Sequence, residues 1–314
     1  MKIVFWAKGE RGRSCLEAFN KAGYRAELLV LHPEEQGRTG ALLGFAHKLG
    51  IPTVFPEDPN SVEFRQRLKG VQADLFVLAG YGKILKDAVL QIPGCMSINL
   101  HGGKLPQYRG SSPLNWTLIN GEKSFSLSVI KVDGGVDTGD LLLERTYEIL
   151  PEYTIVNLHE IANRDFPHML LEVLKKISEG TLVAQTQDEQ QAGYYPLRFP
   201  DDGLIIWDLF TAEQVHNRIR ALTEPYPCAT TYFDGRKVRL LTAALQAPSF
   251  FGEPGRIYRK TSRGLLICAK DKSLWIEKAL FEDGSNLFDA VKRYDSLITM
   301  RGAIAAGFTL GVTR

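Results

Sequence analysis

The sequence contains few cysteines and no long hydrophobic run, and each shortage excludes a class of protein. Its four cysteines, Cys15, Cys95, Cys228 and Cys268, lie far apart and form no CxxC pair, so neither a disulfide framework nor a zinc knuckle is indicated. No apolar run approaches the roughly 18–20 residues of a membrane span, and no cleavable signal follows residues 1–8. We therefore expect a protein of the reducing cytoplasm that is neither secreted nor inserted into a membrane.

An excess of charge of one sign is also absent. The 314 residues include 38 Lys and Arg against 36 Asp and Glu, a net charge of +2, and 44% of them are hydrophobic. This composition is typical of a globular protein, and the length suffices for two domains of about 100–200 residues each. The six histidines show no HExxH or HxH spacing. We therefore expect no metal, which argues against a metal-dependent hydrolase.

The first half of the chain alternates between strand-like and helix-like segments. Strands are expected at 2–6, 26–31, 74–79, 96–100, 125–132 and 141–149, and helices through Leu16 and Phe19 and at about 40–49, 59–69, 84–90 and 153–180. This alternation predicts an α/β fold with an open, mainly parallel twisted sheet and helices on both faces. The loop from Gly9 to Gly12 lacks the GxGxxG pattern, so we do not expect a nicotinamide dinucleotide.

The second half changes character after residue 185. Residues 185–203 are polar and twice interrupted by proline, which indicates an extended linker. After a helix at about 211–222, short alternating segments predict a smaller β-rich domain, either an antiparallel barrel or a sandwich. The predicted organisation is a catalytic domain at 1–185, a linker at 186–206 and a C-terminal β-rich domain at 207–314.

Two segments carry residues suited to chemistry. Asn99 and His101 are two apart near the end of a predicted strand, so both side chains face the same side of the sheet edge where α/β proteins bind ligands. The second segment, 133–140, reads DGGVDTGD. An amide, an imidazole and a carboxylate together suit acyl transfer, although a lone histidine is often structural and Asp-Gly pairs often only make turns.

At these residues the sequence resembles the formyltransferases that use 10-formyltetrahydrofolate. Their signature is Asn-x-His, an LPxYRG-like loop and a distant Asp in a DxG turn, which match 99–101, 105–110 and 137–139 here. The resemblance implies a Rossmann-like first domain, an OB-like second domain and a catalytic trio. Asn99 would hold the oxyanion, His101 would move the proton, and Asp137 would orient and tune His101.

The resemblance also implies binding residues. The folate would be held at Lys83, Ile84 and Leu85, and at Asp133, Gly134, Gly135, Val136 and Asp137. Candidate substrate residues are Gly102, Gly103, Lys104, Tyr108, Arg109, Ser111 and Arg198. The chain departs from the family at Gly103 and Lys104, where some relatives carry Ser and Leu, and at Ser111, where one close relative has a basic residue.

The acceptor is predicted from charge and from the finer resemblance. Residues 31–50 contain Arg38 and Lys48 against Glu34 and Glu35, without the basic excess that a tRNA-binding loop needs. The 101–116 and 196–203 stretches look more like the amino-sugar branch, such as the UDP-4-amino-4-deoxy-L-arabinose and dTDP-4-amino-4,6-dideoxyglucose formyltransferases. We therefore expect N-formylation of a dTDP-, UDP- or GDP-linked 4-amino sugar for O-antigen, lipopolysaccharide or another surface polysaccharide.

Other acceptors and roles stay open at this point. Residues 204–314 hold 16 Lys and Arg against 11 Asp and Glu, a net charge of +5, which favours methionyl-tRNA as the alternative acceptor. A glycinamide ribonucleotide formyltransferase would have a single shorter domain. A binder without activity would have lost the trio. As partners we expect folate and the sugar nucleotide, no membrane and no nucleic acid except under the tRNA alternative, and the family allows a homodimer.

Overall fold

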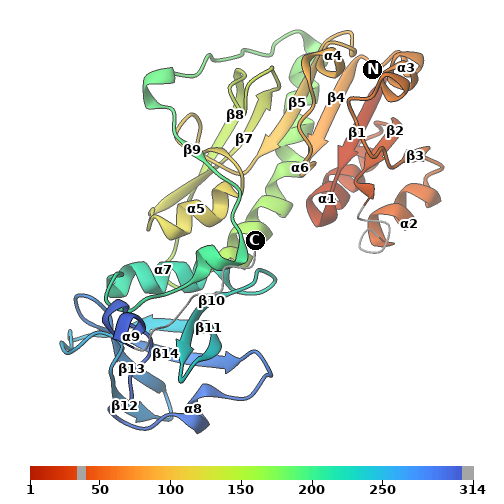
Figure 1. The fold of residues 1–314 in the computed structure, drawn as a ribbon. Coiled ribbons are helices and arrows are strands. Elements are labelled where there is room, and N and C mark those ends of the chain that lie inside the picture. The colour runs from red at the N-terminus through yellow and green to blue at the C-terminus, as the bar shows by residue number, and fades with distance from the viewer. Residues whose placement is uncertain (34–39, 306–314) are drawn as a thin grey trace. The chain divides into compact units, whose positions relative to one another are not determined.

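The computed structural model describes residues 1–33 and 40–305 (Figure 1). The chain forms two compact units. Unit 1 comprises Met1–Pro113, Ser124–Glu148 and Leu158–Pro196, and unit 2 comprises Leu114–Lys123, Ile149–Asn157 and the chain from Leu197 onward. Glu34, Glu35 and Arg38, whose charges entered the acceptor prediction, lie outside the described residues.

A single sheet forms the centre of unit 1, with strand order β3-β2-β1-β4-β5-β7-β8. The strands are β1 (Ile3–Ala7), β2 (Ala26–Leu31), β3 (Thr53–Val54), β4 (Leu75–Ala79), β5 (Met96–His101), β7 (Ser124–Lys131) and β8 (Leu141–Glu148). The first five pair in parallel, whereas β7 runs antiparallel to both β5 and β8. The predicted mainly parallel sheet is confirmed. β7 and β8 form a hairpin because the loop between them is too short for a parallel crossover.

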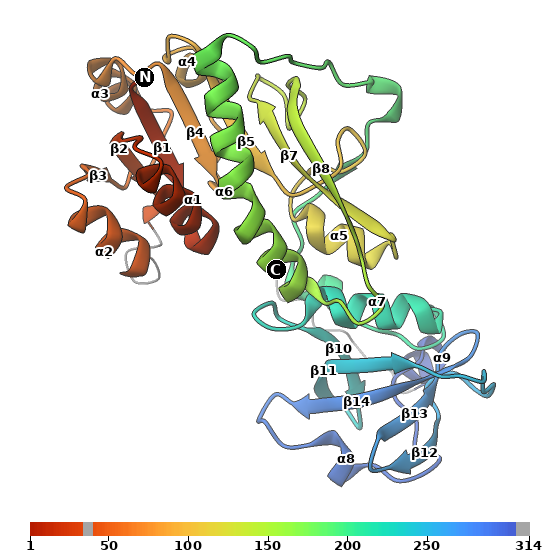
Figure 2. The same cartoon turned by 180° about the vertical axis from the view of Figure 1, so that it is seen from behind.

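Helices cover both faces of this sheet (Figures 1 and 2). They are α1 (Gly9–Lys21), α2 (Gly40–Lys48), α3 (Val62–Val71), α4 (Asp87–Leu90) and the long α6 (Ile155–Glu179). On one face, Phe5 of β1 packs on Phe19 of α1 with ring centroids 5.6 Å apart, and Arg11 of α1 lies 5.0 Å from the ring of Phe166 in α6. The other face packs against α3 and α4.

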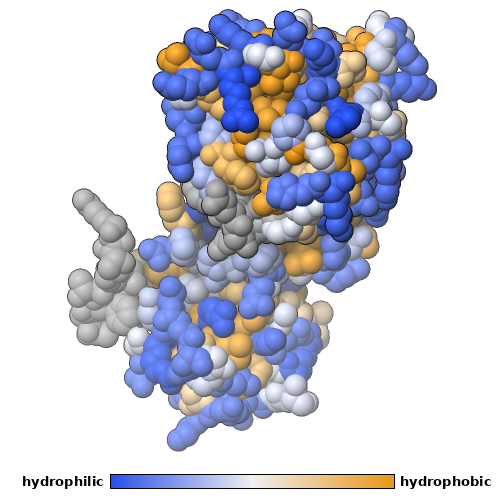
Figure 3. Space-filling view, turned by 90° about the vertical axis from the view of Figure 1, so that its right-hand side faces the viewer, coloured by the Kyte–Doolittle hydropathy of each residue, from blue (hydrophilic) through white to orange (hydrophobic). Residues whose placement is uncertain are grey.

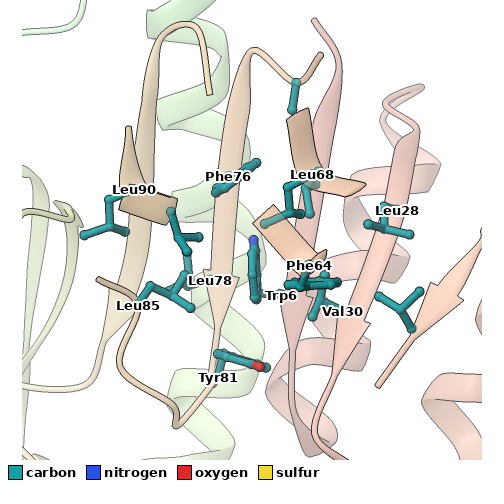
Figure 4. Packing of buried hydrophobic residues seen from close by; sticks show 14 residues of the cluster. Trp6, Leu28, Val30, Phe64, Leu68, Phe76, Leu78, Tyr81, Leu85 and Leu90 are labelled. Carbon is teal, nitrogen blue, oxygen red and sulfur yellow. The ribbon is translucent and has the colours of Figure 1, made fainter. Parts of the chain in front are cut away.

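Trp6 lies in the core of that second face (Figure 4). It is fully buried, with ring centroids 5.9 Å from Phe64, 5.6 Å from Phe76 and 5.1 Å from Tyr81. Burying a large apolar side chain stabilises the fold by about 1.5–3 kcal/mol. Because Trp6 is next to last in β1 and Tyr81 follows β4, this core holds the carboxyl ends of the central strands in place.

Unit 2 is built around a five-stranded antiparallel sheet with the order β10-β11-β14-β13-β12. Its strands are β10 (Ala229–Phe233), β11 (Arg236–Leu245), β12 (Ile257–Thr261), β13 (Gly264–Cys268) and β14 (Ser273–Phe281). Its helices are α7 (Ala212–Leu222), α8 (Leu287–Ala290) and α9 (Met300–Ala305), together with most of α5 (Pro113–Ile119). The predicted β-rich C-terminal domain is thus confirmed as a single antiparallel sheet.

The segment predicted to be an extended linker contains short elements of its own. It contains the 3-10 helices η2 (Glu189–Gln191) and η3 (Pro200–Gly203), and the strand β9 (Tyr194–Tyr195), which pairs in parallel with β6 (Arg109–Gly110). Local composition misled the prediction because the partners of this segment are about 80 residues earlier in the chain, in unit 1.

Hydrophilic side chains surround scattered apolar ones on the face of the molecule shown in Figure 3. Within residues 1–33 and 40–305, no helix has the length and apolar character needed to cross a membrane.

Candidate active site

His101 and Asp137 meet at the carboxyl end of β5. His101 is the last residue of that strand, and Asp137 lies in the loop between β7 and β8. The imidazole Nδ1 is 3.4 Å from Asp137 Oδ2, and the two side chains are 5% and 14% exposed. The imidazole Nε2 is 2.7 Å from the carbonyl oxygen of Tyr108. Because a carbonyl can only accept, Nε2 carries the proton in this arrangement.

Asn99 faces the same side of β5 as His101, since alternate residues of a strand share a face. In register, Asn99 is opposite Ile130 and His101 is opposite Ser128 on β7. Asn99 is partly exposed, and its side-chain amide has no hydrogen-bond partner within the described part of the chain. An amide in this state is available to donate to a ligand oxygen.

The loop that carries Asp137 is held in an unusual conformation. Asp137 has a φ of +53°, in the left-handed region that residues other than glycine seldom adopt. Its Oδ2 accepts a 2.9 Å hydrogen bond from the Gly110 amide, and its carbonyl accepts a 2.8 Å bond from the side chain of Gln187. Sequence analysis did not identify Gln187, because one Gln in a Gln-rich polar segment carries no distinguishing signal.

The two loops predicted to bind folate lie side by side. A Cβ on Gly134 would be 2.6 Å from Oδ1 of Asp87, which opens α4 two residues after Leu85. A side chain at 134 would therefore displace the Asp87 carboxylate. Ile84 is 74% exposed, whereas Leu85 is buried in the core beside Trp6.

The ends of these loops are fixed by local hydrogen bonds. Lys83 donates from Nζ to the Glu57 carbonyl at 2.6 Å. The Asp133 carboxylate accepts from the Gly135 amide and from the Thr138 hydroxyl, at 3.1 and 2.5 Å. Val136, at the tip, is exposed. The arrangement presents backbone groups and two apolar side chains on fixed loops.

The predicted substrate residues fall into two groups. Most of them follow β5 directly, where Gly102, Gly103 and Tyr108 are buried, Lys104 is exposed and Ser111 is half-buried. The ring of Tyr108 stacks on Tyr195 with centroids 4.8 Å apart. Arg198 belongs to unit 2, where its guanidinium lies 4.8 Å from the ring of Trp116 and burial lowers its pKa.

Arg109 differs from the others because it is completely buried and bonded to protein groups. Its guanidinium contacts Gln187, Glu189 and Tyr194, with a shortest distance of 2.6 Å to Glu189 Oε1. The hydrogen bond from Arg109 lowers the pKa of Glu189. The guanidinium of Arg109, a predicted substrate residue, is therefore bonded to side chains of unit 1 itself.

A metal centre is not formed by the residues that the structure describes, since they include no group of three or more His, Cys, Asp or Glu placed to hold an ion. The site brings together one amide, one imidazole and one carboxylate, a set that suits proton transfer and stabilisation of an oxyanion.

Comparison with known proteins places these features in context. Residues 1–174 match the model of the formyl transferase family, and residues 199–288 match that of the formyl transferase C-terminal domain. Methionyl-tRNA formyltransferases of Acetivibrio thermocellus and Ruminiclostridium cellulolyticum are 34% and 32% identical to this chain; each alignment covers 91% of the chain and 94% of the relative. The solved N-formyltransferase of Helicobacter canadensis, in complex with folinic acid and dTDP-3-aminofucose, has a TM-score of 0.70 at 17% identity, covering 88% of this chain and 99% of that one.

These comparisons contradict the predicted acceptor. Relatives that align along nine-tenths of both chains are named for methionyl-tRNA, whereas the sugar N-formyltransferase is similar at 17% identity, which shows the fold alone. The expectation of a nucleotide-linked 4-amino sugar, with its surface-polysaccharide role, is therefore wrong. The prediction relied on the near-neutral 31–50 segment and on the likeness of 101–116 and 196–203 to the amino-sugar branch. Short stretches of this kind say little about a binding surface assembled from the whole chain.

Proposed function

This chain belongs to the formyl transferase family, enzymes that transfer formyl groups, and we propose that it formylates the amino group of methionyl-tRNA with 10-formyltetrahydrofolate as donor. The observation that carries the proposal is the convergence of Asn99, His101 and Asp137 at the end of β5, in a chain whose relatives are named for this acceptor. We further propose that residues 1–185 perform the transfer and that 207–314 assist in binding the acceptor.

In the proposed reaction the methionyl amine attacks the formyl carbon. A new bond forms from carbon to the amine nitrogen, and the bond from carbon to the folate N10 breaks. Asn99 donates its unpaired amide to the formyl oxygen, where negative charge develops. His101 gives up its bond to the Tyr108 carbonyl, delivers the Nε2 proton to the leaving N10 and regains one from the attacking amine, so the protons balance. Asp137 orients the imidazole through its contact with Nδ1.

The folate fits the adjoining loops at 83–85 and 133–137. Ile84 and Val136 present exposed apolar side chains, and glycines at 134 and 135 leave backbone groups accessible. A flat heteroaromatic ring needs such a combination of apolar contact and backbone hydrogen bonds. These loops would orient N10 toward the end of β5.

The charge of the C-terminal part of the chain supports tRNA as the acceptor. Residues 204–314 carry a net charge of +5. Several arginines of this part lie over aromatic rings, among them Arg259, 5.5 Å from partly exposed Phe250, and Arg293, 4.5 Å from exposed Tyr294. Basic surface neutralises phosphates, and exposed rings stack on unpaired bases.

The test measures formyl transfer from 10-formyltetrahydrofolate, followed by release of tetrahydrofolate, to charged initiator methionyl-tRNA and to a panel of 3- and 4-amino sugar nucleotides. We expect turnover with the tRNA and none with the sugars. Turnover with a sugar nucleotide alone would refute the proposed acceptor. Silence with every acceptor would refute the proposed activity.

A further inference from the structure

We propose that Gln187 is a positioning residue that holds the Asp137 loop for catalysis, and that buried Arg109 holds Gln187 in turn. The inference rests on the proposed reaction, because it concerns the placement of Asp137 against His101. Gln187 and Arg109 lie outside the trio, and Gln187 comes from the segment that the sequence predicted to be a linker. Arg109, Gln187 and Glu189 form one hydrogen-bonded group.

Gln187 uses every hydrogen-bonding position of its amide. Its Nε2 donates to the carbonyl oxygens of Asp137 and Gly139, at 2.8 and 2.6 Å. Its Oε1 accepts from Nε and Nη2 of Arg109, at 3.1 and 3.0 Å. The amide therefore has one possible orientation, since the reverse would set its N–H groups against the guanidinium. The side chain is only 9% exposed.

Arg109 likewise uses every hydrogen-bond donor of its side chain. All five of its N–H groups find acceptors, because Nη2 also donates to Glu189 Oε1 at 2.6 Å while Nη1 donates to Glu189 Oε2 and the Tyr194 hydroxyl at 2.9 and 2.7 Å. The Glu189 hydrogen bond and charge raise the pKa of Arg109 further above its ordinary value. A fully buried charge is costly unless it is paired and hydrogen-bonded in this way. The guanidinium is therefore a rigid anchor for Gln187.

The Asp137 loop needs this support. A non-glycine residue at φ +53° is disfavoured, by on the order of 1–3 kcal/mol, and persists only when its surroundings hold it. Gln187 holds the backbone of Asp137 on one side. On the other, the amide of Gly110, next to Arg109 in β6, holds its carboxylate at 2.9 Å. Arg109 is therefore linked to both supports, because its side chain bonds Gln187 and its backbone adjoins Gly110.

The two residues before Gln187 are also bonded to the chain just after the Asp137 loop. Gln185 forms an antiparallel bridge with Leu141, with two backbone hydrogen bonds at 2.8 and 2.9 Å. The Thr186 hydroxyl donates to the Asp140 carboxylate at 3.1 Å. Figure 1 draws this stretch in green, passing the loop between β7 and β8. Three successive residues thus follow the Asp137 loop, and Gln187 alone among them reaches the backbone of Asp137 itself.

The experiment compares Gln187→Ala, the isosteric Gln187→Glu and the control Gln185→Ala. Glu at 187 still accepts from Arg109 but cannot donate to the two carbonyls when ionised. We expect kcat to fall roughly 10- to 100-fold in both Gln187 variants, the scale of a misplaced reacting group, with little change in Gln185→Ala, whose side chain is exposed. Circular dichroism and the melting temperature establish that each variant is folded.

A double-mutant cycle separates positioning from a general structural effect. If Gln187 acts through Asp137, then adding Gln187→Ala to Asp137→Asn should lower kcat by less than about twofold more. Losses that multiply in the double variant would overturn the proposal. If Gln187→Ala does not fold, Gln187→Glu decides the matter, and a wild-type kcat in that variant would also overturn it. Wild-type inactivity with all acceptors refutes the proposed function instead, so the two failures are distinguishable.

Discussion

At the scale of single residues, the site depends on groups whose freedom is restricted in different ways. Among residues 1–33 and 40–305 the Asn99 amide has no hydrogen-bond partner. The His101 imidazole, by contrast, is held between the Tyr108 carbonyl and the Asp137 carboxylate. An unpaired donor can bind a developing oxyanion at once. The held imidazole is already oriented when the substrate arrives.

Removing either group should reveal these roles. We expect Asn99→Ala and His101→Ala each to reduce kcat by about 100-fold or more, the usual scale for an oxyanion donor or an acid–base group. His47→Ala is a matched control, because His47 is exposed on α2. Steady-state formyl transfer makes the measurement, and a near-normal rate in either variant would contradict the role assigned to that residue.

A second prediction at the scale of single residues concerns Gly103. A Cβ there would lie 2.7 Å from His101 Nε2 and 2.8 Å from the Tyr108 carbonyl, so a methyl group must break their hydrogen bond. We expect Gly103→Ala to lower kcat by up to about 100-fold through displacement of the imidazole. Gly70→Ala in α3, where a Cβ meets nothing within 4 Å, should leave kcat unchanged. Equal rates in the two variants would show that the imidazole tolerates the methyl group.

At the scale of elements, α1 and α6 are joined by a buried pair whose ionisation affects stability. Arg11 donates from Nη2 to Nδ1 of His159 at 3.3 Å. Burial, and then the charge of Arg11, lower the pKa of His159 to about 4. A histidine with a lowered folded-state pKa stabilises the protein fully above its unfolded pKa of about 6.5, and this stabilisation is lost as the pH falls toward 4.

We therefore expect the free energy of unfolding to fall between pH 7 and pH 4, with His159 contributing up to roughly 3 kcal/mol of the loss. Urea denaturation across this range, in wild type and in His159→Gln, measures the contribution. The variant cannot titrate at this position, so its stability should depend less on pH. Parallel curves for the two proteins would mean that His159 is not the group that ionises.

The elements also show which kinds of pattern predict structure. The strands at 26–31, 74–79 and 96–100 and the long helix near 153–180 were predicted within a few residues, because a buried element carries a hydrophobic period in its own sequence. β6 and β9 were not predicted. Each is two residues long, and each exists through its pairing with the other across 85 positions.

At the scale of the whole molecule, the proposed tRNA acceptor predicts how binding depends on salt concentration. If tRNA is bound through its phosphates, affinity must fall as salt displaces the protein from them. We expect the KM for methionyl-tRNA to rise at least tenfold between about 50 and 200 mM salt, while the KM for 10-formyltetrahydrofolate changes much less. A KM for tRNA that is insensitive to salt would argue against a phosphate-binding surface on either unit.

The sequence by itself determined the layered fold and predicted the catalytic trio that we propose. Hydrophobic period is a local property, and Asn99 and His101 share a face because they are two apart on one strand. Only the tertiary structure decided that Arg109 is an internal anchor, that Gln187 holds Asp137, and that the Tyr108 carbonyl holds His101. Those contacts join residues up to 78 positions apart, and in sequence a buried, paired arginine cannot be distinguished from one that awaits a ligand, because its partners are chosen by packing.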